Sequence, residues 1–516
     1  MNDPAQLLLA VKAAVSTRDG PLHLTCRAKG RALDRRWSTF ALLADDLTAI
    51  CDLATAPITT IELTVAKTAR PLHPAQLGRA LSNDTRGLLG FELRAGTRIA
   101  RISPMETVTR NLGPKAAFDR LAAELDHPAL ATRWTFAADQ ILIDLVRQRR
   151  HRLHRGAVVV PQTAITRVST TEMATAMTRW LAAQVGPDGA THYKYWPSSG
   201  THSGANNTVR QFMASACLAL ATRRDTSVID ACARNFHYNF STFYTEEDDI
   251  GLISEGDKVK LGAAAVAVVA ILNLPDASPY QRQLSRLTRF LLMMQNPDGS
   301  FRTFLRPKNR NDNQNFYPGE ALLALTMLDD PALTPAILRG FHHYRTQYRK
   351  DRNPAFIPWH SMACCRHYRS VQDPELAEFV FEMNDWLVTL QALAPAQPDT
   401  IGEFFTPQTA DFGPPHASST GVYLEGLIAA HRLACEFGHQ SRAETYRHAI
   451  LRGLRSLRQL QFTDLTDHYY LNRTARVLGG LRSSTHDNTL RLDNVQHGLM
   501  AIWQILDRFG DTDFEV

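Results

Sequence analysis

The sequence predicts a mainly α-helical fold, in which a ring of six helical hairpins follows a small α+β domain. Two observations predict the ring. Helical segments recur roughly every 55 residues beyond residue 165, and one kind of turn follows several of them. A third observation predicts the separate domain, because the first 150 residues contain short segments that alternate apolar and polar residues, as half-buried strands do. We therefore expect one domain at residues 1–150 and a second at 165–516.

The first 150 residues combine strand and helix patterns. Strands are predicted at 22–26, 59–66, 87–94 and 97–102, and helices at 40–54 and 116–125. The stretch 82–121, in which a strand pair leads through Ser103-Pro104 into a helix, resembles the AMME-syndrome candidate-gene domain. The sequence of the first 150 residues holds no phosphate loop, metal cluster or nucleophile motif, so we assign this domain no chemistry.

A turn of the form Gln…Pro-Asp-Gly…aromatic follows the first helix of several predicted pairs. It is complete at 184–193 and 295–301, degenerate at 391–405 and faint at 461–470. The six predicted pairs of outer and inner helices are 171–185 with 206–222, 226–244 with 257–273, 278–295 with 318–328, 331–350 with 356–371, 373–392 with 416–437, and 441–460 with 494–509. Six such pairs are the number that closes a ring.

The second helix of each pair is the more apolar one. Residues 261–272 are hydrophobic around the whole circumference of a helix, which requires a helix with no solvent-facing side. This pattern resembles the (α/α)6 toroid superfamily, which includes six-hairpin glycosidases and N-acylglucosamine 2-epimerase-like proteins. The resemblance implies a carbohydrate-active enzyme that acts on a sugar or a uronate-containing oligosaccharide by hydrolysis or by epimerisation. The alternative is a non-catalytic glycan-binding or scaffold subunit of a polysaccharide biosynthesis pathway, which would bind a protein partner through its amino-terminal domain.

The amino ends of the inner helices are predicted to converge on one end of the ring, where unpaired N–H groups favour anionic or hydroxylated ligands. Every segment that precedes an inner helix carries a His, Asp or Glu. The candidate catalytic residues are Glu255, Glu320, His360, Asp493 and His497. Candidate substrate-binding residues, chosen for stacking on a sugar and bonding to its hydroxyls, are Tyr193, Trp196, His202, Asn206, Tyr317, Trp359, His416, Arg482 and Arg491.

Two mechanisms stay open at this stage. Hydrolysis would use two carboxylates from Glu255, Glu320 and Asp493, whereas epimerisation or elimination would use His360, His416 and His497 as base and acid. Each carboxylate also suits a helix cap, and each histidine also suits a satisfied place in the core. We expect the loop 479–484 to border the substrate, because its glycines would let the chain approach a ligand closely.

The overall composition excludes several other classes. The net charge of +6 permits an acidic ligand but does not indicate nucleic acid, and the basic block 147–155 is expected to be a solvated helix end or a linker. Seven cysteines without paired spacing predict neither a disulfide framework nor a zinc site. The longest apolar run is too short to span a bilayer. We expect a reduced, cytoplasmic protein with no metal, no cofactor, no nucleic-acid partner and no membrane span.

Overall fold

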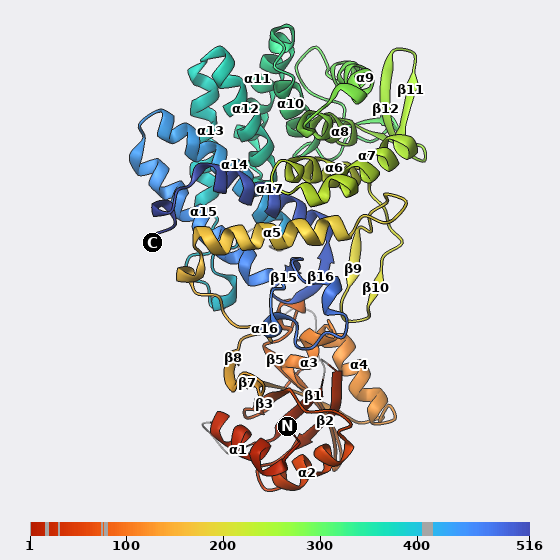
Figure 1. Ribbon diagram of the computed structural model, residues 1–516, viewed down its shortest axis with the longest axis vertical. Coiled ribbons are helices and arrows are strands. Elements are labelled where there is room, and N and C mark those ends of the chain that lie inside the picture. Colours follow the sequence, from red (N-terminus) through yellow and green to blue (C-terminus); the bar gives the residue numbers. More distant parts are fainter. Residues whose placement is uncertain are drawn as a thin grey trace.

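The computed structural model describes residues 2–15, 20–28, 31–73, 76, 81–404 and 416–515. Figure 1 shows a β-rich part at the amino terminus and a large array of helices above it. Phe405, the last residue of the degenerate turn, lies outside the described residues.

The amino-terminal part is built on one antiparallel sheet with the strand order β2-β1-β3-β7-β5-β6, and β4 and β8 also pair with β7. Its strands are β1 (Leu22–Ala28), β2 (Arg31–Ser38), β3 (Thr60–Ala66), β4 (Arg70–Pro71), β5 (Leu89–Ala95), β6 (Arg98–Ile102), β7 (Thr132–Asp144) and β8 (Arg149–Leu153). Its helices are α1 (Pro4–Ala14), α2 (Leu43–Leu53), α3 (Pro104–Thr109) and α4 (Pro114–Glu124). The four predicted strands and the two predicted helices are all present.

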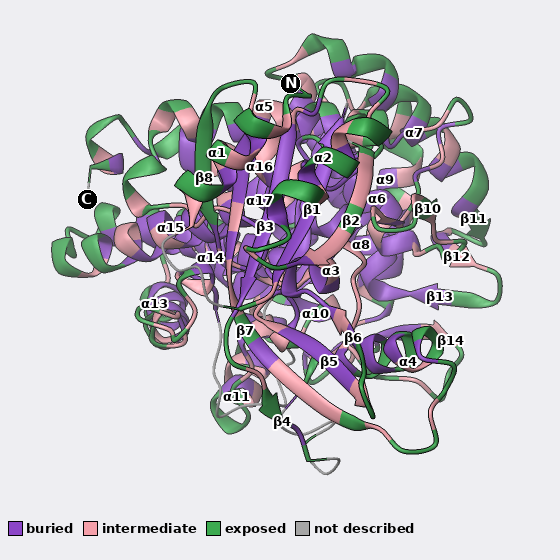
Figure 2. Cartoon of the chain, turned by 90° about the horizontal axis from the view of Figure 1, so that it is seen from below, coloured by how far each residue is buried: buried purple, intermediate pink, exposed green. Residues whose placement is uncertain are grey.

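Both faces of the central strands are buried. Leu22 and Leu24 of β1 pack with α1 and α2, while Phe91 and Leu93 of β5 pack with α4. Figure 2 shows β1 and β3 buried between the more exposed helices α1 and α2 and the rest of the molecule. Alternate residues of a strand point to opposite faces, so His23 and Arg27 of β1 face away from the layer of α1 and α2.

The basic block is a hairpin and an edge strand, so the expectation of a helix end or linker is wrong. Asp144 Oδ1 accepts the backbone N–H groups of Val146 and Arg147 at 3.0 Å each, which closes the turn between β7 and β8. Gln148 completes it with a φ of 53°. The arginines of β8, which are Arg149, Arg150 and Arg152, are exposed at the edge of the sheet.

The twelve predicted helices of the ring are present. The outer helices are α5 (Arg167–Ala183), α7 (Ile229–Phe243), α9 (Gln281–Met293), α11 (Thr334–Lys350), α13 (Pro374–Thr389) and α15 (Gln440–Leu460). The inner helices are α6 (Thr208–Thr222), α8 (Leu261–Asn273), α10 (Tyr317–Met327), α12 (Ile357–Val371), α14 (Ala417–Glu436) and α17 (Leu492–Arg508). Each inner helix packs on the next, and α17 packs on both α14 and α6, so the chain forms an (α/α)6 toroid.

In three of its copies the recurring turn bonds to a neighbouring outer helix through the glutamine side chain. Gln295 Nε2 donates to the Ala336 carbonyl at 2.9 Å, and Gln391 Nε2 donates to the Ala449 carbonyl at 2.9 Å. In the same turn Gly299 has a φ of 90°, and a Cβ there would lie 2.1 Å from the Arg339 carbonyl oxygen. The glycine is therefore required twice, by its backbone conformation and by its contact with the following helix.

The last copy of this turn closes the ring on the first outer helix. Gln461 Nε2 donates to the Met173 carbonyl at 3.2 Å, and a Cβ on Gly479 would lie 2.1 Å from the Ala176 carbonyl oxygen. Both carbonyl groups belong to α5. The close approach of Gly479 is to protein backbone, and that the loop 479–484 borders the substrate stays a prediction.

Two small sheets are formed by segments that connect helices of the ring. One has the order β10-β9-β16-β15, with β9 (Lys194–Trp196), β10 (Thr201–His202), β15 (Arg482–Ser484) and β16 (Asp487–Arg491). The other has the order β11-β12-β13-β14, with β11 (Tyr244–Glu247), β12 (Ile250–Glu255), β13 (Lys258–Lys260) and β14 (Phe304–Arg306). Because β13 occupies residues 258–260, α8 begins at Leu261 and not at the predicted residue 257.

The β15–β16 hairpin joins the ring to the amino-terminal part. Arg86 Nη1 donates to the His486 carbonyl at 2.6 Å, and Asn111 Nδ2 donates to Asp487 Oδ1 at 3.0 Å. Figure 1 shows this hairpin and the short helix α16 (Leu465–His468) lying between the two parts. Among the helices of the described residues, none combines the length and the apolar character needed to cross a bilayer.

Candidate active site

A charged cluster forms where the amino ends of α6 and α17 meet. Asp493, the second residue of α17, is fully buried. Arg491 Nε donates to Asp493 Oδ1 at 2.9 Å, and Arg210 Nε of α6 lies 3.3 Å from Asp493 Oδ2. The side chains of Arg210 and Arg491 are 27% and 25% exposed, so both arginines reach solvent while the carboxylate does not.

The two arginines keep Asp493 ionised. Burial alone would raise the pKa of this carboxyl, but the positive charges of Arg210 and Arg491 outweigh it and lower the pKa to about 2. Asp493 is therefore a fixed negative charge at neutral pH, and it holds two cations side by side. It is poorly suited to donate a proton.

Beside this cluster, His497 and Glu425 form a buried pair. His497 Nδ1 lies 2.9 Å from Glu425 Oε1, which links the second turn of α17 to the middle of α14. Burial raises the pKa of Glu425, and His497 opposes that rise. When His497 Nδ1 donates to the carboxylate, Nε2 carries the lone pair, and Nε2 lies 3.5 Å from Arg210 Nη1. Trp359 packs edge-on against the imidazole, with ring centres 5.8 Å apart.

Glu320 provides a second buried carboxyl near the amino end of an inner helix. It lies in the first turn of α10, and its Oε2 has no hydrogen-bond partner among the described residues. Burial raises the pKa of Glu320 to about 8, against the opposing charge of Arg210. A Cβ on Gly262 would lie 2.4 Å from this oxygen, so the glycine of α8 makes the room that the carboxyl occupies.

Two aromatic candidates also lie at this end of the ring. The Arg491 guanidinium lies 5.6 Å from the centre of the Tyr193 ring, and the Tyr193 carbonyl accepts the Leu492 N–H at 3.1 Å. Tyr317 begins α10 and packs over Gly262, and burial followed by the charge of Glu320 raises its pKa. Tyr193 therefore covers one guanidinium of the cluster, and Tyr317 covers the Glu320 side.

His416 caps an inner helix. Its Nδ1 accepts the Ser419 N–H at 3.2 Å at the start of α14. Burial and the nearby Arg491 lower the pKa of His416 to about 4, so the ring is neutral and available as an acceptor. This capping role was not predicted for His416, which the sequence nominated for substrate binding and as a base or acid.

His360 and Glu255 lie apart from the charged cluster. The His360 ring stacks on Phe356 with ring centres 3.6 Å apart, and it also faces Tyr344 of the outer helix α11. Burial lowers the pKa of His360 to about 3. Glu255 ends β12 and pairs with Lys260 Nζ at 3.1 Å. Neither residue contacts Asp493 or His497.

The other four predicted binding residues have neighbours of their own. Trp196 lies in the β9–β10 hairpin, where it pairs with Thr201. His202 packs against His192 at a ring distance of 4.3 Å. Asn206 accepts a hydrogen bond from Gln211 at 2.8 Å. Arg482 is buried and donates to the Gln459 carbonyl at 2.6 Å.

Arg210 and Glu425 are not among the residues that the sequence predicts for the site. Arg210 is a cation in the first turn of a helix, where the helix dipole disfavours positive charge. Glu425 is a single carboxylate within the apolar run of an inner helix. Each residue is energetically unfavourable at its position in the helix. This unfavourable placement is the signal in the sequence that could have identified them as functional residues.

No family model and no curated protein matches the sequence. Several solved structures resemble it in fold at low identity. An unsaturated glucuronyl hydrolase specific for heparin is 14% identical with a TM-score of 0.49, over 66% of this chain and 97% of that chain. A sugar epimerase from a ruminal bacterium is 10% identical with a TM-score of 0.48, over 67% and 99%. The GH76A alpha-1,6-mannanase from Salegentibacter sp. HEL1_6 is 10% identical with a TM-score of 0.47, over 65% and 98%.

Proposed function

We propose that this chain is a carbohydrate-active enzyme that acts on a sugar by proton transfer at the inner-helix amino ends, as in epimerisation or elimination. The observation that carries the proposal is the His497–Glu425 pair at 2.9 Å, which lies beside two partly exposed arginines, Arg210 and Arg491. A buried carboxylate that fixes the tautomer of an imidazole is the usual arrangement of a general base.

In this mechanism His497 Nε2 removes a proton from a carbon next to a carbonyl or carboxylate group of the sugar. Glu425 stabilises the imidazolium that forms. Arg210 and Arg491 bind the oxygens that gain negative charge as the C–H bond breaks, and Asp493 keeps the two guanidiniums together. Addition of a proton from solvent to the opposite face of the carbon gives epimerisation, whereas loss of a β-substituent, which takes up a proton as it leaves, gives elimination.

Glycoside hydrolysis is the second candidate, and the two carboxyls with opposite pKa shifts support it. Burial raises the pKa of Glu320 to about 8, so it is protonated at neutral pH and suits a general acid. Asp493, with a pKa of about 2, stays ionised. An acid and a carboxylate with separated pKa values are what glycosidic cleavage requires.

The test is proton NMR of the full-length protein in D₂O with neutral and acidic mono- and oligosaccharides. Deuterium exchange of a ring proton or a new vinylic signal supports the first proposal, and substitution of His497 by Asn should abolish either. New reducing-end anomeric signals that depend on Glu320 support hydrolysis instead. Line broadening without any product supports the non-catalytic glycan-binding alternative and overturns both enzymatic proposals.

A further inference from the structure

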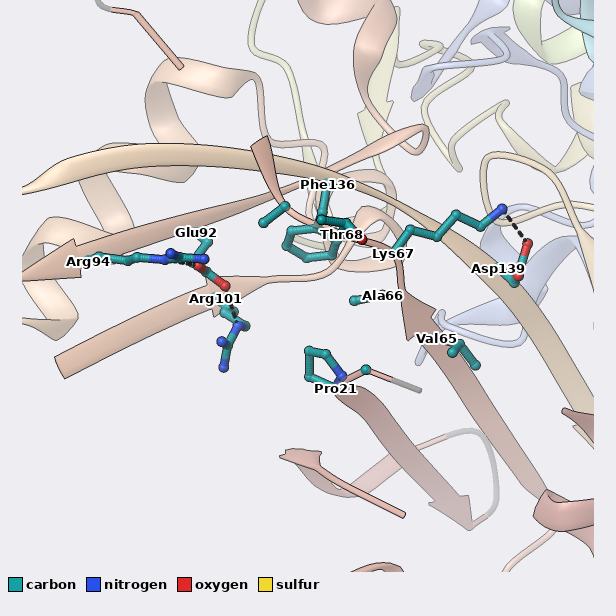
Figure 3. Close-up of a pocket in the computed structure, with 12 residues that line it drawn as sticks. Pro21, Val65, Ala66, Lys67, Thr68, Glu92, Arg94, Arg101, Phe136 and Asp139 are labelled. Carbon is teal, nitrogen blue, oxygen red and sulfur yellow. Dashed lines mark hydrogen bonds and ion pairs between the residues drawn. The ribbon is translucent and has the colours of Figure 1, made fainter. Parts of the chain in front are cut away.

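The amino-terminal sheet contains a cleft of about 560 Å³ (Figure 3). Strand β7 joins the two halves of this sheet, because its residues 138–144 pair with β3 and its residues 132–137 pair with β5. The sheet is strongly curved, because its first and last strands in the order, β2 and β6, approach each other: Trp37 Nε1 of β2 donates to the Arg101 carbonyl of β6 at 3.2 Å. The cleft lies within this curl.

One wall of the cleft presents two guanidinium groups on a single buried carboxylate. Arg101 Nε donates to Glu92 Oε2 at 2.5 Å, and Arg94 Nε donates to Glu92 Oε1. Glu92 is only 3% exposed, whereas both arginines reach solvent. Among the described residues, the terminal nitrogens of these two arginines make no hydrogen bond. They are therefore anchored cations with free donors.

The opposite wall carries a second pair of charges. Lys67 Nζ lies 3.1 Å from Asp139 Oδ1, and Lys67 is 57% exposed. Figure 3 shows this pair on the other side of Pro21, Ala66 and Phe136 from the Glu92 group, with the Lys67 side chain extended away from that group toward Asp139. The floor of the cleft is thus apolar, while each wall offers both hydrogen-bond donors and carboxylate acceptors.

We propose that this cleft binds a short acidic oligosaccharide, separately from the site in the ring. The cleft has three cations against two carboxylates, which favours an anionic ligand. The carboxylates would repel a bare phosphate, but they accept hydrogen bonds from sugar hydroxyls, and the apolar floor matches the C–H face of a sugar ring. For its ligand class this inference rests on the proposed carbohydrate function, and it adds a second place where the same polymer is held.

The test is calorimetric titration of the full-length protein with α-1,4-trigalacturonate, and with maltotriose as the neutral probe. The double variant Lys67→Gln/Arg101→Gln should weaken trigalacturonate binding at the cleft by about tenfold or more, since it removes two charge-assisted donors. Lys115→Gln is the matched control, because Lys115 is an exposed lysine on α4 that pairs with Asp119 and does not line the cleft.

A ring variant, Arg491→Gln, separates this inference from the proposed function. We expect it to keep the cleft affinity while the NMR reaction is lost. If the cleft variant binds trigalacturonate as the wild type does, the cleft proposal is overturned and the proposed function is untouched. Equal binding of maltotriose or of inorganic phosphate would also overturn it. Thermal unfolding midpoints equal to that of the wild type will show that the variants are folded.

Discussion

Substitution of Glu425 by Gln tests the proposed chemistry most directly, because it removes one charge and almost no volume. The carboxylate lies 2.9 Å from His497 Nδ1, so an imidazolium that forms during proton abstraction loses its nearest anion. Two unit charges about 4 Å apart at an effective dielectric constant near 20 interact by about 4 kcal/mol. That energy corresponds to a fall in kcat of about 10³-fold.

The assay is the rate of ring-proton exchange in D₂O with whichever sugar of the panel the wild type turns over. KM should change little, because Glu425 is buried behind His497 and does not reach the ligand. The pH profile should change as well. Burial raises the pKa of Glu425, so the activity of the wild type should increase with pH as this carboxyl ionises. The pH–rate profile of Glu425→Gln should lack that increase.

The matched control is Glu436→Gln on the same helix, where the carboxylate is surface-exposed and pairs with Arg432. It should leave kcat unchanged. ¹⁵N NMR of the His497 ring gives a readout without any substrate, since loss of the carboxylate should alter the balance of tautomers. A Glu425→Gln enzyme with kcat within threefold of the wild type would refute the assignment of this pair as the catalytic base.

Three further predictions concern stability. Gly299→Ala should lower the free energy of unfolding by about 3 kcal/mol, because it combines left-handed backbone strain with a Cβ 2.1 Å from a carbonyl oxygen. Gly438→Ala, which has a φ of 70° but no atom within 4 Å of its Cβ, should cost only about 1 kcal/mol in the same urea titration. The pKa of Asp493 lies near 2 in the folded state and below its unfolded value, so its contribution of about 2 kcal/mol is present above pH 4 and fades toward pH 2. Asp493→Asn should remove that part of the acid dependence, and an unchanged difference in unfolding free energy between pH 6 and pH 3 would contradict this. Burial raises the pKa of Glu320 from 4.5 to about 8, so the stability that its protonated form contributes is full below pH 4.5 and is lost as pH rises toward 8. Glu320→Gln should therefore raise the unfolding free energy at pH 8 by about 2 kcal/mol, and a less stable variant at that pH would show that the carboxyl is paired when folded.

The helices of the ring were predictable because their patterns are local and strong. Residues 261–272 are apolar on every side, and such a helix has only one stable environment, the inside of a second helical layer. The strands of the amino-terminal sheet were predictable for the same reason, since their alternation reflects one local period. The basic block was not, because nothing in its composition indicates that Asp144 closes a hairpin just before it.

The site was predictable only as far as chain position determines it. Asp493, His497 and Arg491 stand at the start of an inner helix, and that place already brings them to the end of the ring. Arg210 and Glu425 join them only because α17 packs on both α6 and α14, and Arg210 is 287 residues away from His497. Which helices become neighbours depends on closure of the ring, and no local pattern carries that information.

His360 shows what chain position does not determine. It stands in the first turn of α12, as predicted, but its ring faces Phe356 and the outer helix. Chain position gives the height of a residue along the ring axis, whereas the direction of its side chain around the helix depends on how the helix is rotated against its neighbours.

Closure of the last turn on α5 has a consequence for how this architecture can change during evolution. An open array of repeats can gain or lose one unit at either end, because each unit contacts only its neighbours. Here Gln461 and Gly479 of the sixth hairpin dock on the first, so one added or deleted hairpin would separate both contacts at once. The copy number of the repeat is therefore fixed. Changes in length are confined to the rim, where segments such as the β11–β12 hairpin can grow or shorten while the ring stays closed.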